Sequence, residues 1–212
     1  ITIARDRHGE VPLHYSLLEN SLFPHFIFAS EIKGLRAMGV DYSTINMLPP
    51  GSYIRATNTN KIKTEKGLWY DIRQNLKKNL FTDRDSASKR IKNLVEQGSI
   101  ERTVSAVPVC VLLSGGVDSS VIALAALKNI PNLTSYIAVH DEKSKDLKCA
   151  REVSEMLNIE LVEVKVEPPT VDDVKDIINT IEMNYKAQIE IAWPCIKLAQ
   201  RIASDGFKVV LS

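Results

Sequence analysis

The sequence predicts an α/β protein in which a segment of antiparallel β-structure precedes a segment built on a parallel sheet. Short apolar runs separated by Gly, Pro and Asn fill residues 1–70 without a regular alternation of strands and helices. From residue 107 onward, strand-like and helix-like runs alternate. The run 107–113 is apolar at nearly every position and precedes two glycines. Such a run is typical of a parallel strand that is covered on both faces.

The first segment is expected to hold short strands, turns and one brief helix. Strands 1–4 and 11–15 flank a turn at His8-Gly9, so we expect them to pair as a hairpin. A strand at 26–29 and a helix at 31–38 follow. Ser30 is the expected cap of this helix and Gly39 its end. Strands at 52–56 and 61–70 complete the segment, joined by a turn at 58–60.

The polar residues of this segment carry little chemistry of their own. The histidines have no Cys or Ser partner at a suggestive spacing, so they are interpreted as surface or half-buried residues; they are His8, His14 and His25. Arg5, Asp6 and Arg7 are interpreted as a structural cluster of ion pairs.

Residues 71–85 are polar and charge-rich and are expected to connect two domains. The predicted division is 1–72 for the first domain, 73–85 for the linker and 86–212 for the second domain. Asp85 or Ser86 would cap a helix whose apolar stripe is Ala87, Ile91, Leu94 and Val95. The linker should be the most protease-sensitive part of the chain.

The second domain is expected to alternate strands and helices around one parallel sheet. The expected strands are 107–113, 134–140, 159–166 and 207–211, and the expected helices are 117–127, 147–157, 171–181 and 191–203. Helix 117–127 is apolar at almost every position, so we expect it to be mostly buried. Ligands of such sheets bind beyond the carboxyl ends of strands, where the strand order switches.

The sharpest chemical signal follows the strand 107–113. Ser114-Gly115-Gly116 forms a tight turn, and Asp118, Ser119 and Ser120 fall in the first turn of the next helix. Backbone N–H groups, the positive end of a helix dipole and hydroxyls meet there, beside a carboxylate able to hold Mg²⁺. The spacing fits neither a Walker A loop nor a dinucleotide fingerprint. A plain turn capped by Ser114 or Asp118 would explain only one of these polar residues.

The stretch 114–120, SGGVDSS, resembles the signature loop of the PP-loop ATP pyrophosphatases. The resemblance implies a Rossmann-like domain that splits ATP into AMP and pyrophosphate. It places the pyrophosphate on Ser114, Gly115, Gly116, Ser119 and Ser120, with Asp118 as the Mg²⁺ ligand. It also implies that the backbone near Val139, at the end of the next strand, receives the adenine. His140 is interpreted as a surface residue, and Asp146 as a helix cap.

The first domain resembles the late part of the glutaminase domain of asparagine synthetases, a class II glutamine amidotransferase. The matching residues are Ala4-Arg5-Asp6-Arg7, Gly9, Pro12-Leu13, Tyr15, the run 28–33 (FASEIK), Leu48-Pro49-Pro50-Gly51 and Trp69. In that family the cysteine nucleophile and the glutamine-binding residues precede this stretch, so the sequence is interpreted as a fragment of a longer protein.

The segment 181–202 resembles the part of asparagine synthetases that contains the catalytic glutamate. The likeness places Glu182 on that glutamate, which acts on the ammonia or the acyl-adenylate. Without the resemblance, Glu182 can also be interpreted as a solvated carboxylate at the end of a helix. Glu190, Ile191 and Ala192 replace the family's Arg-Ala-Ser in the acceptor pocket. The acceptor is therefore expected to differ from aspartate unless Glu190 points to solvent and Lys186 or Lys197 supplies the charge.

Together these resemblances imply an ATP-dependent ligase that forms an amide. A carboxylate would be activated as its acyl-adenylate and attacked by ammonia derived from glutamine, with ATP and Mg²⁺ required. The alternatives left open are a non-catalytic nucleotide-binding module of the same fold and a β-lactam-synthetase-like ligase. A homodimer is compatible with the resemblance.

The composition is that of a globular protein without an obvious macromolecular ligand. Hydrophobic residues make up 44% and charged residues 25%, and the net charge is +1. This charge gives no reason to expect nucleic acid or an anionic membrane as a partner. Cys110, Cys149 and Cys195 lie far apart and are interpreted as small buried side chains in a reducing compartment, the cytoplasm.

Overall fold

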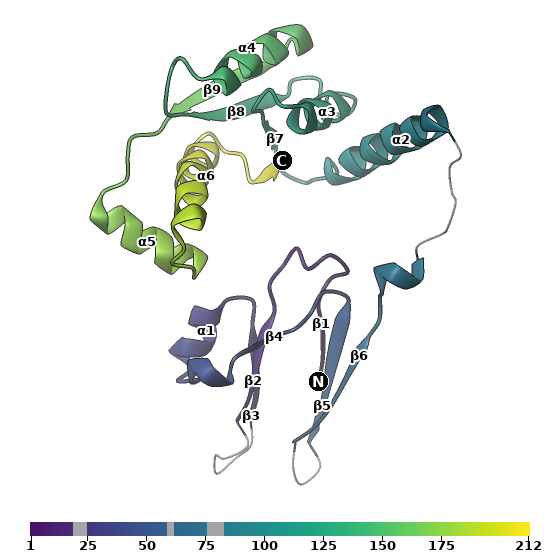
Figure 1. Ribbon diagram of the computed structural model, residues 1–212, viewed down its shortest axis with the longest axis vertical. Coiled ribbons are helices and arrows are strands. Elements are labelled where there is room, and N and C mark those ends of the chain that lie inside the picture. The colour runs from purple at the N-terminus through teal and green to yellow at the C-terminus, as the bar shows by residue number, and fades with distance from the viewer. Residues whose placement is uncertain (19–24, 59–61, 76–82) are drawn as a thin grey trace. The chain divides into compact units, whose positions relative to one another are not determined.

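The computed structural model describes residues 1–18, 25–58, 62–75 and 83–212. The chain divides into two compact units, Ile1–Leu80 and Phe81–Ser212 (Figure 1). The predicted linker, 73–85, falls for the most part on 76–82, which lie outside the described residues, as does most of the predicted turn at 58–60.

The first unit is antiparallel β-structure, as the sequence predicts, and its strands form two small sheets. The sheets have the strand orders β1-β5-β6 and β3-β2-β4. Their strands are β1 (Thr2–Ala4), β2 (His14–Leu18), β3 (His25–Ala29), β4 (Asn46–Met47), β5 (Ser52–Asn58) and β6 (Ile62–Leu68). Helix α1 (Ile32–Ala37) and 3₁₀ turns at Tyr42–Thr44 and Ile72–Asn75 complete the described part. Helix α1 begins after Glu31 without a side-chain cap, so the predicted cap at Ser30 is wrong.

The predicted hairpin between the first two strands is wrong. Strand β1 pairs with β5, where Ile3 lies opposite Ile54, and β2 pairs with β3 and β4 in the other sheet. This pairing buries Ile3, Ile54, Tyr15 and Leu48 in one apolar cluster to which both sheets contribute. Burying these four side chains together outweighs the closeness of the two strands in sequence.

The cluster Arg5-Asp6-Arg7 is structural, but it works through the backbone rather than through ion pairs. Arg5 donates to the carbonyl oxygens of Gly9, Val11 and Leu48 at 2.8–2.9 Å. Asp6 accepts the N–H groups of His8, Glu10 and Val11 at 3.0–3.1 Å. These backbone hydrogen bonds, led by that from Glu10, lower the pKa of Asp6 to about 2. The two side chains thus fix the turn that carries the chain from one sheet to the other.

One of the three histidines departs from the prediction of surface or half-buried positions. His14 is buried, and its Nδ1 lies 3.2 Å from the carbonyl oxygen of Ser30. Strand β2 is the centre of its sheet, so a residue on its inner face loses contact with water. His8 and His25 are exposed, as predicted.

The second unit is a four-stranded parallel sheet with helices on both faces, which confirms the predicted α/β class. The strand order is β10-β7-β8-β9. The strands are β7 (Val109–Leu112), β8 (Thr134–Val139), β9 (Glu160–Lys165) and β10 (Val209–Leu211). The helices are α2 (Arg84–Arg102), α3 (Val117–Ala126), α4 (Lys145–Leu157), α5 (Val171–Ile181) and α6 (Lys186–Ser204).

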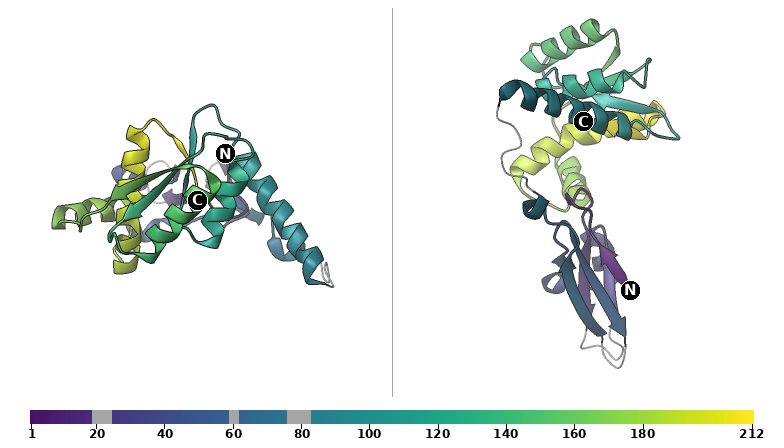
Figure 2. Two further views of the ribbon diagram at one scale, coloured as in Figure 1. Left: turned by 90° about the horizontal axis from the view of Figure 1, so that it is seen from above. Right: turned by 90° about the vertical axis from the view of Figure 1, so that its right-hand side faces the viewer.

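The alternation of side chains between the two faces of each strand explains which helices pack on each face of the sheet. Val109, Val111 and Leu113 pack with residues of α3 and α4 on one face of the sheet. Cys110 and its neighbour Tyr136 of β8 face the other way and pack against α6. Helices α4 and α6 accordingly lie on opposite sides of the sheet (Figure 1; Figure 2, right). A strand buried on both faces must be apolar throughout, which is why 107–113 stands out in the sequence.

Several local predictions for the helices need correction. Asp83, not Asp85 or Ser86, caps α2 by accepting the N–H of Ser86 at 2.8 Å. Ser144, not Asp146, caps α4 by accepting the N–H of Leu147 at 3.2 Å. Helix α6 begins at Lys186, before the predicted 191, and runs through Pro194.

The burial predicted for α3 and for the cysteines is only partly correct. Helix α3 buries Ala123, Ala125 and Ala126, but the side chains of Val117 and Leu124 remain 78% and 53% exposed. Only one side of an outer-layer helix meets the sheet, so an apolar sequence does not bury it all round. Cys110 is buried and Cys149 half-buried, whereas Cys195 is exposed. All three cysteines are free.

Candidate functional site

The loop 114–120 lies at the strand where the strand order of the sheet reverses. The chain passes from β7 to β8 and then β9 on one side, whereas β10 is added on the other side of β7. The carboxyl end of β7 is therefore the switch point of the sheet, the place where ligands of such folds bind. The loop leaves β7 at this end and leads directly into α3.

The two glycines of the loop have different structural tasks. Gly115 has φ +72°, and a β-carbon on it would come within 2.4–2.5 Å of the main chain of Cys149 and Ala150 in α4. Gly116 has φ −70°, and a β-carbon there would meet only Ser114 Oγ, at 3.4 Å. Gly115 therefore lets α4 pack against the loop, whereas Gly116 leaves space open at the start of α3.

The serine hydroxyls are folded back onto the loop itself. Ser119 Oγ accepts the N–H of Ser114 at 3.2 Å and lies 3.0 Å from Ser114 Oγ. The hydroxyls of Ser119 and Ser120 both lie within hydrogen-bond distance of the Gly116 carbonyl oxygen, at 3.2 and 2.7 Å. The loop is thus held in one shape before any ligand arrives.

Helix α3 begins without a side-chain cap. Its N-cap is Gly116, so the alternative in which Ser114 or Asp118 caps the helix is wrong. The first N–H groups of a helix have no acceptor within the helix. No side-chain cap serves them in α3, a β-carbon on Gly116 would have space, and the helix dipole adds positive potential at this end. This arrangement fits an anion such as a phosphate group.

Asp118 is exposed in the first turn of α3. In the part of the chain that the structure describes, no three His, Cys, Asp or Glu residues are grouped as a metal site would require. Mg²⁺ is commonly held by one or two carboxylates together with phosphate oxygens and water. Asp118 therefore fits a Mg²⁺ ion that arrives with a nucleotide.

A hollow of about 560 Å³ lies beside the loop, between the sheet and α6. Its lining residues are Leu112, Leu113, Ser114, Tyr136, Ile137, Ala138, Asp146, Glu190, Ile191, Pro194, Cys195 and Leu198. The strands supply an apolar floor, α6 supplies one wall, and Ser114, Asp146 and Glu190 supply polar groups. The hollow thus joins the predicted phosphate loop to the predicted acceptor residue Glu190.

Of the predicted site residues, Ser114 and Glu190 line this hollow, whereas seven do not: Gly115, Gly116, Asp118, Ser119, Ser120, Val139 and Glu182. Glu182 is half-buried and is the C-cap that directly follows α5, with φ +57°. Val139 is buried, and its carbonyl oxygen accepts the N–H of Val166 at 2.9 Å, which directs its backbone groups toward β9. The backbone N–H and C=O groups of Ala138, the preceding residue, point toward the opposite side of the strand. Ala138 lines the hollow instead of Val139. The roles of Glu182 and Val139 stay predictions.

Sequence reasoning missed most of the hollow's lining. Leu112, Tyr136 and Ala138 could have been found from strand alternation, because side chains two residues apart share a face. Pro194 and Cys195 could not, because only the packing of α6 against the sheet determines which side of the helix lines the hollow.

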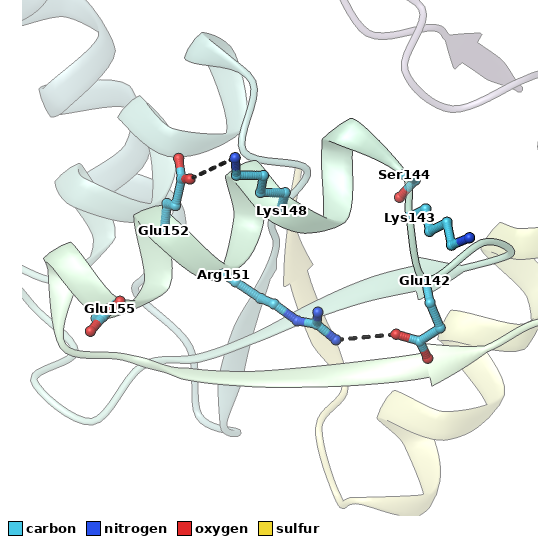
Figure 3. Close-up of a pocket in the computed structure, with 7 residues that line it drawn as sticks. All are labelled: Glu142, Lys143, Ser144, Lys148, Arg151, Glu152 and Glu155. Carbon is cyan, nitrogen blue, oxygen red and sulfur yellow. Dashed lines mark hydrogen bonds and ion pairs between the residues drawn. The ribbon is translucent and has the colours of Figure 1, made fainter.

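A second hollow, of about 360 Å³, lies along α4 and is lined almost entirely by charged side chains (Figure 3). Arg151 is paired with Glu142 at 3.3 Å and with Glu163 at 2.6 Å, and Lys148 lies 4.0 Å from Glu152. The hydrogen bond from Arg151 lowers the pKa of Glu163. The lining residues include three acidic and three basic side chains, so this hollow offers no net charge for a ligand.

A parallel sheet with a glycine turn at its switch point is the general architecture of nucleotide-binding α/β domains. Residues 90–212 match the asparagine synthase family, and the chain belongs to this family. The fold and family that the sequence predicts are thereby confirmed.

Curated relatives extend the likeness over both units. The chain is 28% identical to a probable glutamine-hydrolyzing asparagine synthetase of Dictyostelium discoideum, covering 99% of this chain and 39% of that protein. It is 29% identical to asparagine synthetase B of Escherichia coli, covering 99% and 38%. The chain therefore spans about two fifths of the length of these relatives.

Among solved structures, an NMN synthetase from Francisella tularensis is similar at 21% identity with a TM-score of 0.39, covering 61% of this chain and 54% of that one.

Within the described residues, no helix combines the length and the apolar character needed to cross a membrane.

Proposed function

We propose that this chain is the nucleotide-binding part of a synthetase that uses ATP to join ammonia to a carboxylate. The carboxylate would be activated as an acyl-adenylate, with release of pyrophosphate, and ammonia would then displace AMP. The observation that carries the proposal is the uncapped start of α3, open beside Gly116 at the switch point of the sheet and adjacent to the 560 Å³ hollow.

The loop would act on the pyrophosphate part of ATP. As the carboxylate attacks the α-phosphorus, negative charge grows on the departing pyrophosphate. The N–H groups at the start of α3 would stabilise that charge, and the hydroxyls of Ser114, Ser119 and Ser120 would do so after turning from their partners within the loop. Mg²⁺ bound by ATP and by Asp118 would supply further charge stabilisation.

The remaining site residues would complete the reaction centre. The backbone at the end of β8, at Val139 or its neighbour Ala138, would receive the adenine. Glu182 would act near the ammonia or the acyl-adenylate, and Glu190 would contact the acceptor. Glutamine hydrolysis, named in the relatives, would supply the ammonia in the complete protein. A cytoplasmic location and a homodimeric assembly stay predictions.

The decisive experiment follows the fate of ATP in the complete protein that contains this chain. Radiolabelled ATP, ammonia and a panel of carboxylic acids should yield AMP and pyrophosphate, dependent on the acid. Formation of ADP and phosphate would contradict the proposal. Absence of any acid-dependent turnover, with MgATP still bound, would favour a non-catalytic nucleotide-binding module instead.

A further inference from the structure

The charged side chains that line the hollow beside the loop are all acidic. Two of its lining residues, Asp146 and Glu190, carry carboxylates, and no Lys, Arg or His is among the described residues that line it. The remaining lining side chains are uncharged. A ligand group that carries negative charge would therefore enter the hollow without a cation to pair with, and beside like charge.

The helix wall adds a further hydrogen-bond acceptor. Pro194 lies inside α6, and proline has no N–H group. The carbonyl oxygen of Glu190, four residues earlier, therefore has no i+4 donor in the helix. Both residues line the hollow. Glu190 thus brings two kinds of acceptor to this wall, its carboxylate and its carbonyl.

The nearby lysines do not cancel this preference. Lys186 Nζ lies 3.6 Å from Glu190 Oε1, but the two side chains are 88% and 64% exposed. An ion pair this exposed is weak, because water and salt screen it and both side chains can reorient. Lys197 Nζ lies 4.1 Å from the centre of the Trp193 ring, so its charge is directed to the aromatic face.

We infer that the acceptor is an amino acid with an ammonium group on its side chain, that this group binds against Glu190, and that Glu190 determines this specificity. The inference rests on the proposed function, because it names the substrate class of the same site. The ammonium would donate to the carboxylate, and Asp146 would add attraction at longer range. An acceptor with an acidic side chain would be disfavoured at the same position.

The chain contains its own reporter for this test, because Cys195 is exposed and lines the hollow. The rate of Cys195 alkylation by the neutral reagent iodoacetamide is measured by peptide mass spectrometry in the presence of MgATP. The added acids are 2,4-diaminobutyrate, asparagine and aspartate, which differ chiefly in side-chain charge. The buried Cys110 provides the unreactive reference in the same sample.

Diaminobutyrate is expected to protect Cys195 at about one third of the aspartate concentration, the size expected for one screened charge contact. Glu190→Gln should abolish this difference, whereas Glu155→Gln, an exposed charge outside this hollow, should preserve it. Equal or better protection by aspartate, no protection by any acid, or an unchanged preference in Glu190→Gln would overturn the inference. MgATP binding, measured separately by calorimetry, tests the proposed function. A failure of the proposed function can therefore be distinguished from a failure of the inference about the acceptor.

Discussion

Gly115 packs so closely against Cys149 that a β-carbon on the glycine would lie 2.5 Å from the cysteine Cβ. The backbone at Gly115 also has φ +72°, a conformation that L-residues rarely adopt. The loop is therefore shaped by its contact with α4, and Gly116, not Gly115, leaves the open space beside it. This division of tasks separates the stability of the loop from its capacity to bind.

Substitution of the two glycines should affect different properties. Gly115→Ala should lower the free energy of unfolding by about 2–3 kcal/mol, because it combines a clash with a strained φ. Gly116→Ala should change it by less than about 1 kcal/mol, since its φ is ordinary, but should weaken MgATP binding. Urea unfolding and titration calorimetry measure the two effects. Equal loss of stability in both variants would refute the separation.

Asp118→Asn should weaken binding of MgATP more than binding of metal-free ATP. The amide keeps the shape of the side chain but lacks the charge that Mg²⁺ prefers in a ligand. Calorimetry with and without Mg²⁺ compares the two affinities. Asp172→Asn, an exposed carboxylate on α5 paired with Lys175, serves as the control. If Asp118→Asn changed both affinities by the same factor, Asp118 would not be a metal ligand.

Pro194→Ala should stabilise the second unit. The substitution supplies the N–H group that the Glu190 carbonyl lacks and removes a poor helix former from the interior of α6. We expect the free energy of unfolding to rise by about 1 kcal/mol or more, measured by urea denaturation. A decrease would show that the packing of the proline ring outweighs the restored helix bond.

The first unit should lose stability in acid through Asp6. Its pKa falls from 3.8 to about 2 on folding, because the carboxylate accepts backbone N–H groups. A lowered pKa stabilises the folded state above the unfolded value of 3.8, and this contribution is lost as the pH falls toward 2. Asp6→Asn should flatten the pH dependence of unfolding in this window. An unchanged slope would rule out Asp6 as the group responsible.

The strand, loop and helix at 107–127 were predictable because their signals are local. An apolar run, two glycines and a cluster of hydroxyls lie next to one another in the sequence. The pairing of β1 with β5 was not predictable, because Ile3 and Ile54 meet only in the folded core. The burial of side chains that lie far apart in the sequence determines this pairing, and the turn between the first two strands does not.

The candidate site likewise contains features that local sequence signals do not predict. Pro194 predicts a helix beginning near it, yet α6 begins at Lys186 and carries the proline in its interior. The position of Glu190 on the wall of the hollow follows from that earlier start. Likewise, nothing in the sequence distinguishes Gly115 from Gly116, because the difference depends on how α4 packs against the loop.

The most direct test of the account is a map of where pyrophosphate binds. Backbone amide chemical shifts of the chain are recorded by NMR during titration with magnesium pyrophosphate. We expect the largest changes at the loop and the first turn of α3, at Gly115, Gly116, Val117, Asp118 and Ser119, and we expect Gly116→Ala to reduce them. Largest changes elsewhere, or no change at these amides at saturating ligand, would contradict the account.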